Sequence, residues 1–305
     1  MKLGFVSAIM EKASFHEVID FASEQGFACV ELACWPKQEA DRRYAGVSHL
    51  DVDALDKQKI QEIKDYCAKK KVEISALAFY PNMMEEDLTK REENIRHLKK
   101  LIVAAKDLGI GLVNTFIGRI PQWTVEENLK LCEEIWNPIM KFAEENQVKT
   151  RIENCPILFT EDEWPGGKNL ASTPEIWREI FKRVPSPNLG LNFDPSHFIW
   201  QEMDYIEPLY EFREKIFHVH FKDIKILHNR RKEVGVMALP LSYMLPKLPG
   251  LGDVNWNHFV SALTDIGYRG CACLEIEDRA FEDSREQIEK AILSAKKYME
   301  VLIPA

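Results

Sequence analysis

The sequence has no cysteine pair with the CxxC spacing of a structural zinc module, and its seven cysteines are scattered singly over 305 residues. This pattern indicates reduced cysteines and argues against a disulfide framework. Apolar runs are short as well. None approaches the roughly 18 residues that a membrane span needs, and the first residues lack the apolar core of a signal peptide. We therefore expect a cytoplasmic protein that does not contact a membrane.

Positive charge is also scarce. The chain has 40 Lys and Arg residues against 49 Asp and Glu residues, so its formal net charge is −9. A surface with this balance repels phosphate backbones, and we expect no nucleic acid partner. Hydrophobic residues make up 46% of the chain, which is typical of a globular protein and sufficient for a sizeable core.

A glycine-rich phosphate loop is absent too. The first apolar run, KLGFVSA (residues 2–8), continues into IMEKAS without a glycine. A dinucleotide-binding fold would carry its GxGxxG turn at this point. A doubly wound open sheet is therefore only the second choice of fold.

The sequence does contain a repeated alternation of short apolar runs and longer segments with helical periodicity. Eight runs are typical of strands, at residues 2–8, 28–34, 72–80, 111–118, 148–154, 189–194, 216–221 and 271–277. The intervening segments carry helix-capping residues such as Ser14, Thr173 and Gly109. Eight strand–helix units in about 300 residues predict a (β/α)8 TIM barrel of the α/β class.

No linker rich in Gly, Ser or Pro divides the chain, so residues 1–305 are predicted to form a single TIM-barrel domain. Two long loops interrupt the repeat, at 157–173 and 225–253, and loops of this length are often functional. Trp164 in the first loop is a candidate for stacking on a substrate ring. Loop aromatics also anchor loops or contacts within a homo-oligomer, so both interpretations stay open.

Acidic or imidazole side chains end four consecutive predicted strands. In chain order the candidates are Glu153, Asp194, His218 or His220, and Glu275 or Glu277. Active sites of TIM barrels lie at the carboxyl ends of the strands, so these side chains should converge. Carboxylates this close repel one another unless a cation neutralises them. We infer one divalent metal ion held by three carboxylates and one imidazole, an oxygen-rich set that favours Mn²⁺, with Mg²⁺, Co²⁺ and Zn²⁺ as alternatives.

Strand parity extends this prediction. Alternate side chains of a strand face the same side, so if His220 faces the barrel axis, His218 and Lys222 do as well, with Lys222 at the rim. In the same way, an inward Glu153 places Arg151 below it as a buried cation, a candidate partner of the carboxylates.

Several motifs carry a family resemblance. They are IEN (152–154), DPSH (194–197), HVHFKD (218–223), PGLGDVNW (249–256) and LEIE (274–277). Together they resemble the xylose isomerase-like sugar isomerase and epimerase superfamily of TIM barrels. The resemblance covers almost the whole chain, from GFACVEL (26–32) onward.

The resemblance implies Glu153, Asp194, His220 and Glu275 as the metal ligands, and His197 beside substrate oxygens or a second metal. It also implies a metal-dependent sugar isomerase or epimerase of carbohydrate metabolism, which removes a proton next to a carbonyl through an enediolate. Glu153 and Glu275 would exchange the proton on opposite faces of a small sugar or keto-sugar. The residues expected to bind substrate are His197, Lys222, His218 and Trp164.

Some features leave the substrate open. Ketohexose 3-epimerases carry a glutamate and an arginine where this chain has Phe159 and Ile226, which argues against a free ketohexose. A metal-dependent lyase or dehydratase acting on keto-sugars, keto-inositols or 3-keto-glycosides is the main alternative, and a non-catalytic metal- or sugar-binding barrel is another. An endonuclease IV-like enzyme is disfavoured, because no histidine follows the third or fourth predicted strand.

Overall fold

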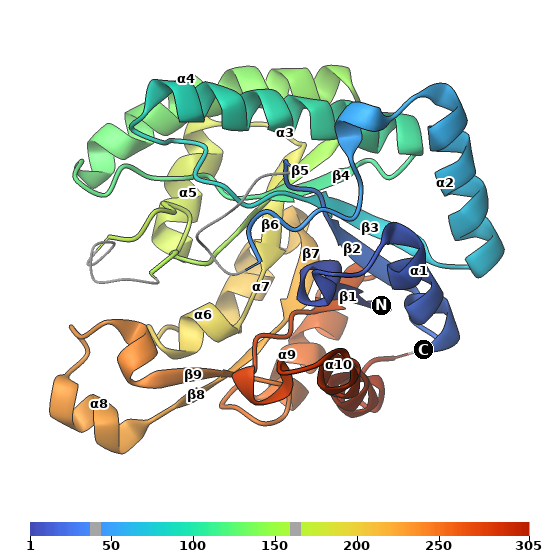
Figure 1. Cartoon of the computed structure of the whole chain (residues 1–305). Coiled ribbons are helices and arrows are strands. Elements are labelled where there is room, and N and C mark those ends of the chain that lie inside the picture. The colour runs from blue at the N-terminus through green and yellow to red at the C-terminus, as the bar shows by residue number, and fades with distance from the viewer. Residues whose placement is uncertain (37–43, 159–165, 305) are drawn as a thin grey trace.

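Eight parallel strands close into a barrel in the computed structural model, which describes residues 1–36, 44–158 and 166–304 (Figure 1). Around the barrel the order is β1-β10-β7-β6-β5-β4-β3-β2. The strands are β1 (Lys2–Val6), β2 (Cys29–Ala33), β3 (Glu73–Ala78), β4 (Leu112–Thr115), β5 (Lys149–Glu153), β6 (Leu189–Phe193), β7 (Ile216–Phe221) and β10 (Cys271–Leu274). Each lies within one of the eight predicted runs, and the predicted (β/α)8 TIM barrel is confirmed.

Helices surround the barrel. They are α1 (Phe15–Glu24), α2 (Lys57–Lys70), α3 (Leu88–Leu108), α4 (Val125–Glu145), α5 (Pro174–Arg183), α6 (Ser196–Ile199), α7 (Glu207–Glu211), α8 (His228–Val234), α9 (Trp256–Asp265) and α10 (Arg285–Glu300). The predicted caps are present: Ser14 forms a capping box, Thr173 caps α5, and Gly109 ends α3 in the left-handed conformation.

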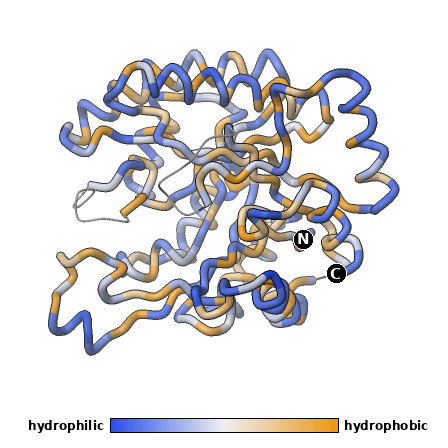
Figure 2. The backbone as a smooth tube through the Cα atoms, viewed as in Figure 1, coloured by the Kyte–Doolittle hydropathy of each residue, from blue (hydrophilic) through white to orange (hydrophobic). Residues whose placement is uncertain are grey.

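The core lies between the strands and the inner faces of these helices. Hydrophobic residues gather along the strands in Figure 2, whereas the outward sides of α3 and α4 are largely hydrophilic. This is the pattern expected of amphipathic helices on a buried parallel sheet. Within the described part of the chain, no helix has the length and apolar character to cross a membrane.

The segment after β7 differs from the irregular loop that the sequence indicates. Residues Asp223–Ile226 form β8 and pair in an antiparallel ribbon with β9 (Met244–Lys247), while α8 lies in the connection between them. The ribbon projects beyond the barrel (Figure 1). Its inner face packs Ile224, Ile226 and Tyr243 against Trp200 and Leu158, so the loop after β6 and the segment after β5 are covered by an ordered excursion.

Asp223 anchors the base of this excursion. Its buried carboxylate accepts hydrogen bonds from the backbone N–H groups of Ile224, Gly250, Gly252 and Val254 and from Trp256 Nε1, at 2.8–3.2 Å. A Cβ atom on Gly252 would lie 2.2 Å from Asp223 Oδ1, so the close approach requires glycine. The PGLGD turn and α9 are thereby tied to the end of β7.

We predict that Asp223→Asn lowers the free energy of unfolding by about 2–4 kcal/mol, because the amide nitrogen must face buried N–H donors. Urea unfolding of both proteins at pH 7 measures this. Asp204→Asn is the matched control, since the exposed Asp204 carboxylate accepts one bond, from Ile206 N. Equal stability of the two variants would contradict the prediction.

Candidate functional site

The carboxyl ends of β5, β6, β7 and β10 bring together Glu153, Asp194, His220 and Glu275. One ligand atom from each residue lies within 4.8 Å of the ligand atoms of the others. Glu153, Asp194 and His220 are buried, and 19% of the Glu275 side chain is exposed. The four residues that the sequence predicts as metal ligands therefore form one cluster.

Several buried oxygen and nitrogen atoms in and beside this cluster make no well-directed hydrogen bond. Glu153 Oε1, Asp194 Oδ2, His197 Nε2 and Glu275 Oε2 make no hydrogen bond of acceptable geometry with any described residue. Buried polar atoms are normally paired, and unpaired ones call for a missing partner. The donor set fits a divalent cation, since carboxylate and imidazole donors of this kind suit Mn²⁺, Co²⁺ or Zn²⁺.

Local backbone contacts orient Asp194. Asn154 Oδ1 accepts from Asp194 N at 2.8 Å, and Asn154 Nδ2 donates to the Asp194 carbonyl at 2.9 Å, which locks the ends of β5 and β6 together. Ser196 N donates to Asp194 Oδ1 at 2.8 Å. This last bond occupies one carboxylate oxygen and leaves Oδ2 facing the cluster.

Glu31, in the middle of β2, also belongs to the site, although the sequence reasoning did not select it. Its carboxylate is fully buried and lies 2.9 Å from His220 Nε2. The other ring nitrogen, Nδ1, lies 3.0 Å from Glu275 Oε2. The available signal in the sequence was that Glu31 is a lone acidic residue in an otherwise apolar strand.

His197 and Cys155 lie beside the cluster. His197 Nε2 is 3.3 Å from Glu153 Oε1 and 3.2 Å from Asp194 Oδ2. Donor atoms of Glu153, Cys155 and His197 also lie within 4.8 Å of one another. A thiol thus borders the carboxylates, which the scattered cysteine positions did not predict.

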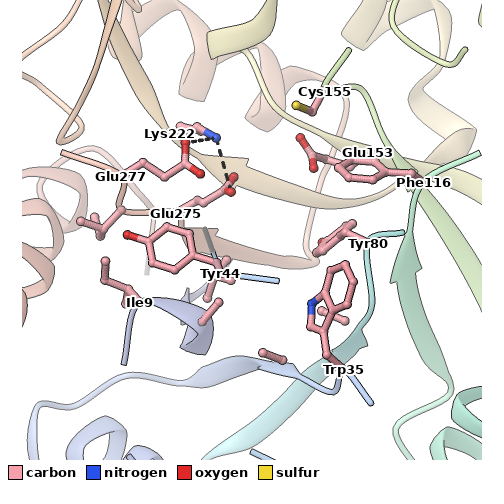
Figure 3. A pocket seen from close by; sticks show the side chains of 15 residues that line it. Ile9, Trp35, Tyr44, Tyr80, Phe116, Glu153, Cys155, Lys222, Glu275 and Glu277 are labelled. Carbon is pink, nitrogen blue, oxygen red and sulfur yellow. Dashed lines mark ion pairs between the residues drawn. The ribbon is translucent and has the colours of Figure 1, made fainter. Parts of the chain in front are cut away.

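Lys222 bridges two glutamates at the rim, as the dashed lines in Figure 3 show. Its Nζ lies 2.6 Å from Glu277 Oε2 and 3.4 Å from Glu275 Oε1. Burial alone would lower the pKa of Lys222, but the two carboxylates raise it well above its ordinary value. Lys222 therefore lines the pocket just beyond the end of β7, the position that strand parity predicts.

The pKa values of Glu153 and Glu275 are shifted in opposite directions. Burial raises the pKa of Glu153 despite the nearby His197. Burial would also raise the pKa of Glu275, but Lys222 and His220 outweigh it and lower that pKa. For His220, burial favours the neutral ring, yet Glu31 and Glu275 raise its pKa well above the ordinary value. Neighbouring carboxyl groups with opposed shifts are typical of sites that perform acid–base chemistry.

A pocket opens above the cluster (Figure 3). Its polar lining among the described residues consists of Glu153, Cys155, Lys222, Glu275 and Glu277. The aromatic part of its wall is formed by Trp35, Tyr44, Tyr80 and Phe116. The pocket therefore combines a polar floor with rings that suit the C–H face of a sugar.

Four further positions from the sequence analysis are His218, Arg151, Trp164 and Phe159. His218 is fully buried one layer below His220, with Nδ1 2.8 Å from Asn192 Oδ1, and does not line the pocket. Substrate binding by His218 stays a prediction. Trp164 and Phe159 lie outside the described residues. Arg151 is buried as predicted, but its Nη2 donates to the Ser75 carbonyl instead of to the carboxylates.

The barrel is closed, and candidate carboxylate and imidazole ligands lie at the carboxyl ends of its strands. These two features are typical of TIM-barrel proteins, whose functional sites lie at this end of the barrel. The family follows from sequence comparison. The family description "Xylose isomerase-like TIM barrel" matches residues 19–298, so the chain belongs to this family.

Individual relatives are more distant. The chain is 25% identical to the Bacillus subtilis protein YfiH, over 91% of this chain and 93% of that protein, and 21% identical to an inosose dehydratase of Clostridium tetani, over 71% and 70%. A D-psicose 3-epimerase structure from Clostridium cellulolyticum H10 superposes with a TM-score of 0.75, at 16% identity and full coverage of both chains. The IolI protein with a bound zinc atom gives 0.74, at 21% identity, covering 99% and 98%.

We predict that Lys222→Met lowers the free energy of unfolding of the metal-free protein by about 1–3 kcal/mol at pH 7, since two glutamates lose their cation. The variant should also lose less stability in acid. Because the pKa of Glu275 is lowered in the folded protein, its carboxylate contributes fully to the free energy of unfolding above the ordinary Glu pKa of about 4.3. This contribution is lost as the pH falls toward the lowered pKa of the folded protein. Without Lys222 the pKa is lowered less.

Urea unfolding in chelator, repeated from pH 7 to pH 3, measures both effects. Lys225→Met is the control, because Lys225 is exposed on β8. Parallel stability curves for wild type and Lys222→Met would show that the lysine does not depress the pKa of Glu275.

Proposed function

We propose that the protein is a divalent-metal-dependent sugar isomerase or epimerase that moves a proton next to a carbonyl through an enediolate. The observation that carries the proposal is the buried cluster of Glu153, Asp194, His220 and Glu275, two of which, Glu153 and Glu275, also line a pocket. Carboxylate oxygens of Glu153, Asp194 and Glu275 make no hydrogen bond of acceptable geometry with any described residue. Epimerases among the structural neighbours are consistent with it.

The four cluster residues would hold the ion. A divalent cation supplies electrophilic stabilisation of the oxygen anion that develops when a proton leaves the neighbouring carbon. The preference for Mn²⁺ remains a prediction from the oxygen-rich donor set. The zinc atom in IolI and the thiol of Cys155 beside the cluster make Zn²⁺ the first competitor to test.

Proton transfer would be divided between two glutamates. Glu275 enters from the end of β10 and Glu153 from the end of β5, and both line the pocket (Figure 3). One removes the proton from one face of the substrate, and the other returns a proton to the opposite face. His197 and Lys222 would hold substrate oxygens, because both nitrogens lie at the edge of the cluster.

Elimination is a second candidate, which the position of Lys222 allows. Its Nζ lies 3.4 Å from Glu275 Oε1, so a base and a proton donor stand side by side in the pocket. After Glu275 removes a proton, transfer of the lysine proton to a neighbouring hydroxyl or glycosidic oxygen would break the carbon–oxygen bond and leave an enone. The inosose dehydratase relatives are consistent with such a reaction. Water or alcohol release distinguishes it from epimerisation.

We predict that Glu153→Gln and Glu275→Gln each lower turnover by about 10²–10⁴-fold, because each removes a group that carries the proton. The measurement is exchange of substrate C–H protons for solvent deuterium by NMR, with a panel of ketohexoses, inososes and 3-keto-glucosides. Glu214→Gln is the control, as this side chain is 88% exposed. Full exchange in either site variant would refute the assignment, and no exchange in wild type would favour a non-catalytic barrel.

We predict that Asp194→Asn loses bound metal, whereas His197→Gln keeps its metal and loses turnover. Asp194 should control metal occupancy, since its Oδ2 makes no hydrogen bond and lies in the cluster, while its other oxygen is held by Ser196. His197 should control turnover with metal still bound. Metal content after dialysis, measured beside deuterium exchange, tests this pair. A His197→Gln protein as depleted of metal as Asp194→Asn would contradict the division of roles.

A further inference from the structure

We propose that Glu31 is a positioning residue that orients the His220 ring, so that Nε2 carries the ring proton and Nδ1 faces the cluster. The inference rests on the proposed function, because it assigns Glu31 a purpose toward the metal that His220 would hold. It concerns a residue on β2, across the barrel from the strands that supply the cluster.

Glu31 is fully buried at the centre of the barrel, and both of its oxygens are occupied. Tyr80 Oη donates to Oε1 at 2.7 Å, Asn114 Nδ2 donates to Oε2 at 2.7 Å, and His220 Nε2 lies 2.9 Å from the same Oε2. An unpaired buried carboxylate would be far too costly, so its donors must be supplied. Asn114 on β4 and Tyr80 just after β3 supply two of these donors, and His220, the candidate metal ligand, supplies the third.

The neighbouring strand is irregular at the level of this carboxylate. Val30 pairs with Ile74 and Glu31 pairs with Ala76, so the extra residue, Ser75, lies on β3. Irregularities of this kind are over-represented beside functional sites, and this one lies directly beside Glu31.

The two ring nitrogens of His220 face different groups. Nε2 faces Glu31, whereas Nδ1 faces Glu275 at 3.0 Å. Asn192 Nδ2 lies 3.0 Å from Nε2 and 3.4 Å from Nδ1. An atom at nearly the same short distance from both nitrogens lies over the face of the ring, so it is in line with the in-plane lone pair of neither nitrogen. Glu31 is therefore the acceptor for Nε2–H, and that bond leaves the Nδ1 lone pair for a cation.

Two substitutions at one position separate the possible roles. Glu31→Gln keeps an oxygen that accepts from His220 and Asn114, and its amide can donate to Tyr80 Oη. Glu31→Met keeps a similar volume without an acceptor. Zn²⁺ affinity is measured by competition with a chromophoric chelator, and long-range ¹H–¹⁵N NMR of the zinc-loaded protein reports the His220 tautomer. Ser75→Ala is the control, since Ser75 contacts His218 and not His220.

We expect Glu31→Gln to bind Zn²⁺ nearly as wild type, and Glu31→Met to bind it about 10–100-fold more weakly, with loss of the protected Nε2–H signal. Equal affinity of Glu31→Met and wild type would overturn the proposal, and so would Glu31→Gln binding as weakly as Glu31→Met, which would indicate a role for charge alone. If Glu31→Met does not fold, the wild-type tautomer decides: protonated Nε2 supports the proposal, and protonated Nδ1 overturns it. Absence of Zn²⁺ and Mn²⁺ binding by wild type would instead refute the proposed function.

Discussion

Repulsion among carboxylates at one end of the barrel is the constraint on which the rest of the structure depends. Glu153, Asp194 and Glu275 converge within a few ångströms in a largely buried place. Such a group is stable only with positive charge among it. In the metal-free protein, Lys222 and the protonated ring of His220 provide part of that charge, in line with the raised pKa of each. A divalent cation would take the place of the proton on His220 Nδ1, and the carboxylate oxygens without a hydrogen bond lie in the same cluster.

The layers below the cluster obey the same requirement at lower charge. Glu31 is matched by hydrogen-bond donors from β4, β7 and the segment after β3, and His218 is held by Asn192 and Ser75 without facing the pocket. Burial lowers the pKa of Arg151, which still donates to a backbone carbonyl. The barrel interior is thus a stack of polar layers. Lower in the barrel, Arg151 Nε and Nη1 and Asn114 Oδ1 make no hydrogen bond with any described residue, but the cluster's carboxylate oxygens without a hydrogen bond lie in the uppermost layer. Charged groups held in place by the layers beneath them are what a pre-organised binding site requires.

Short-range sequence patterns were sufficient for the barrel and for the strand ends that carry the cluster, and the family resemblance then selected His220 over His218 and Glu275 over Glu277. Strands appear as apolar runs, and a carboxylate at the end of a run is visible without knowing its neighbours. Glu31 was missed because its role depends on a contact with His220, 189 residues away. The β8–β9 ribbon was missed because its strands are four residues each and separated by α8. Cys155 looked ordinary because nothing local predicts that the chain turns its thiol toward His197.

The state of Lys222 bears on which reaction follows proton removal. Epimerisation and elimination share the first step and diverge when the next proton is delivered, to carbon in one case and to a leaving oxygen in the other. A general acid is most effective when its pKa lies near the working pH. Glu275 and Glu277 raise the pKa of Lys222 well above its ordinary value, a direction that suits a fixed hydrogen-bonding cation better than a proton donor. The position of Lys222 beside Glu275 therefore allows elimination, whereas the direction of its pKa shift opposes the lysine as the acid of that step.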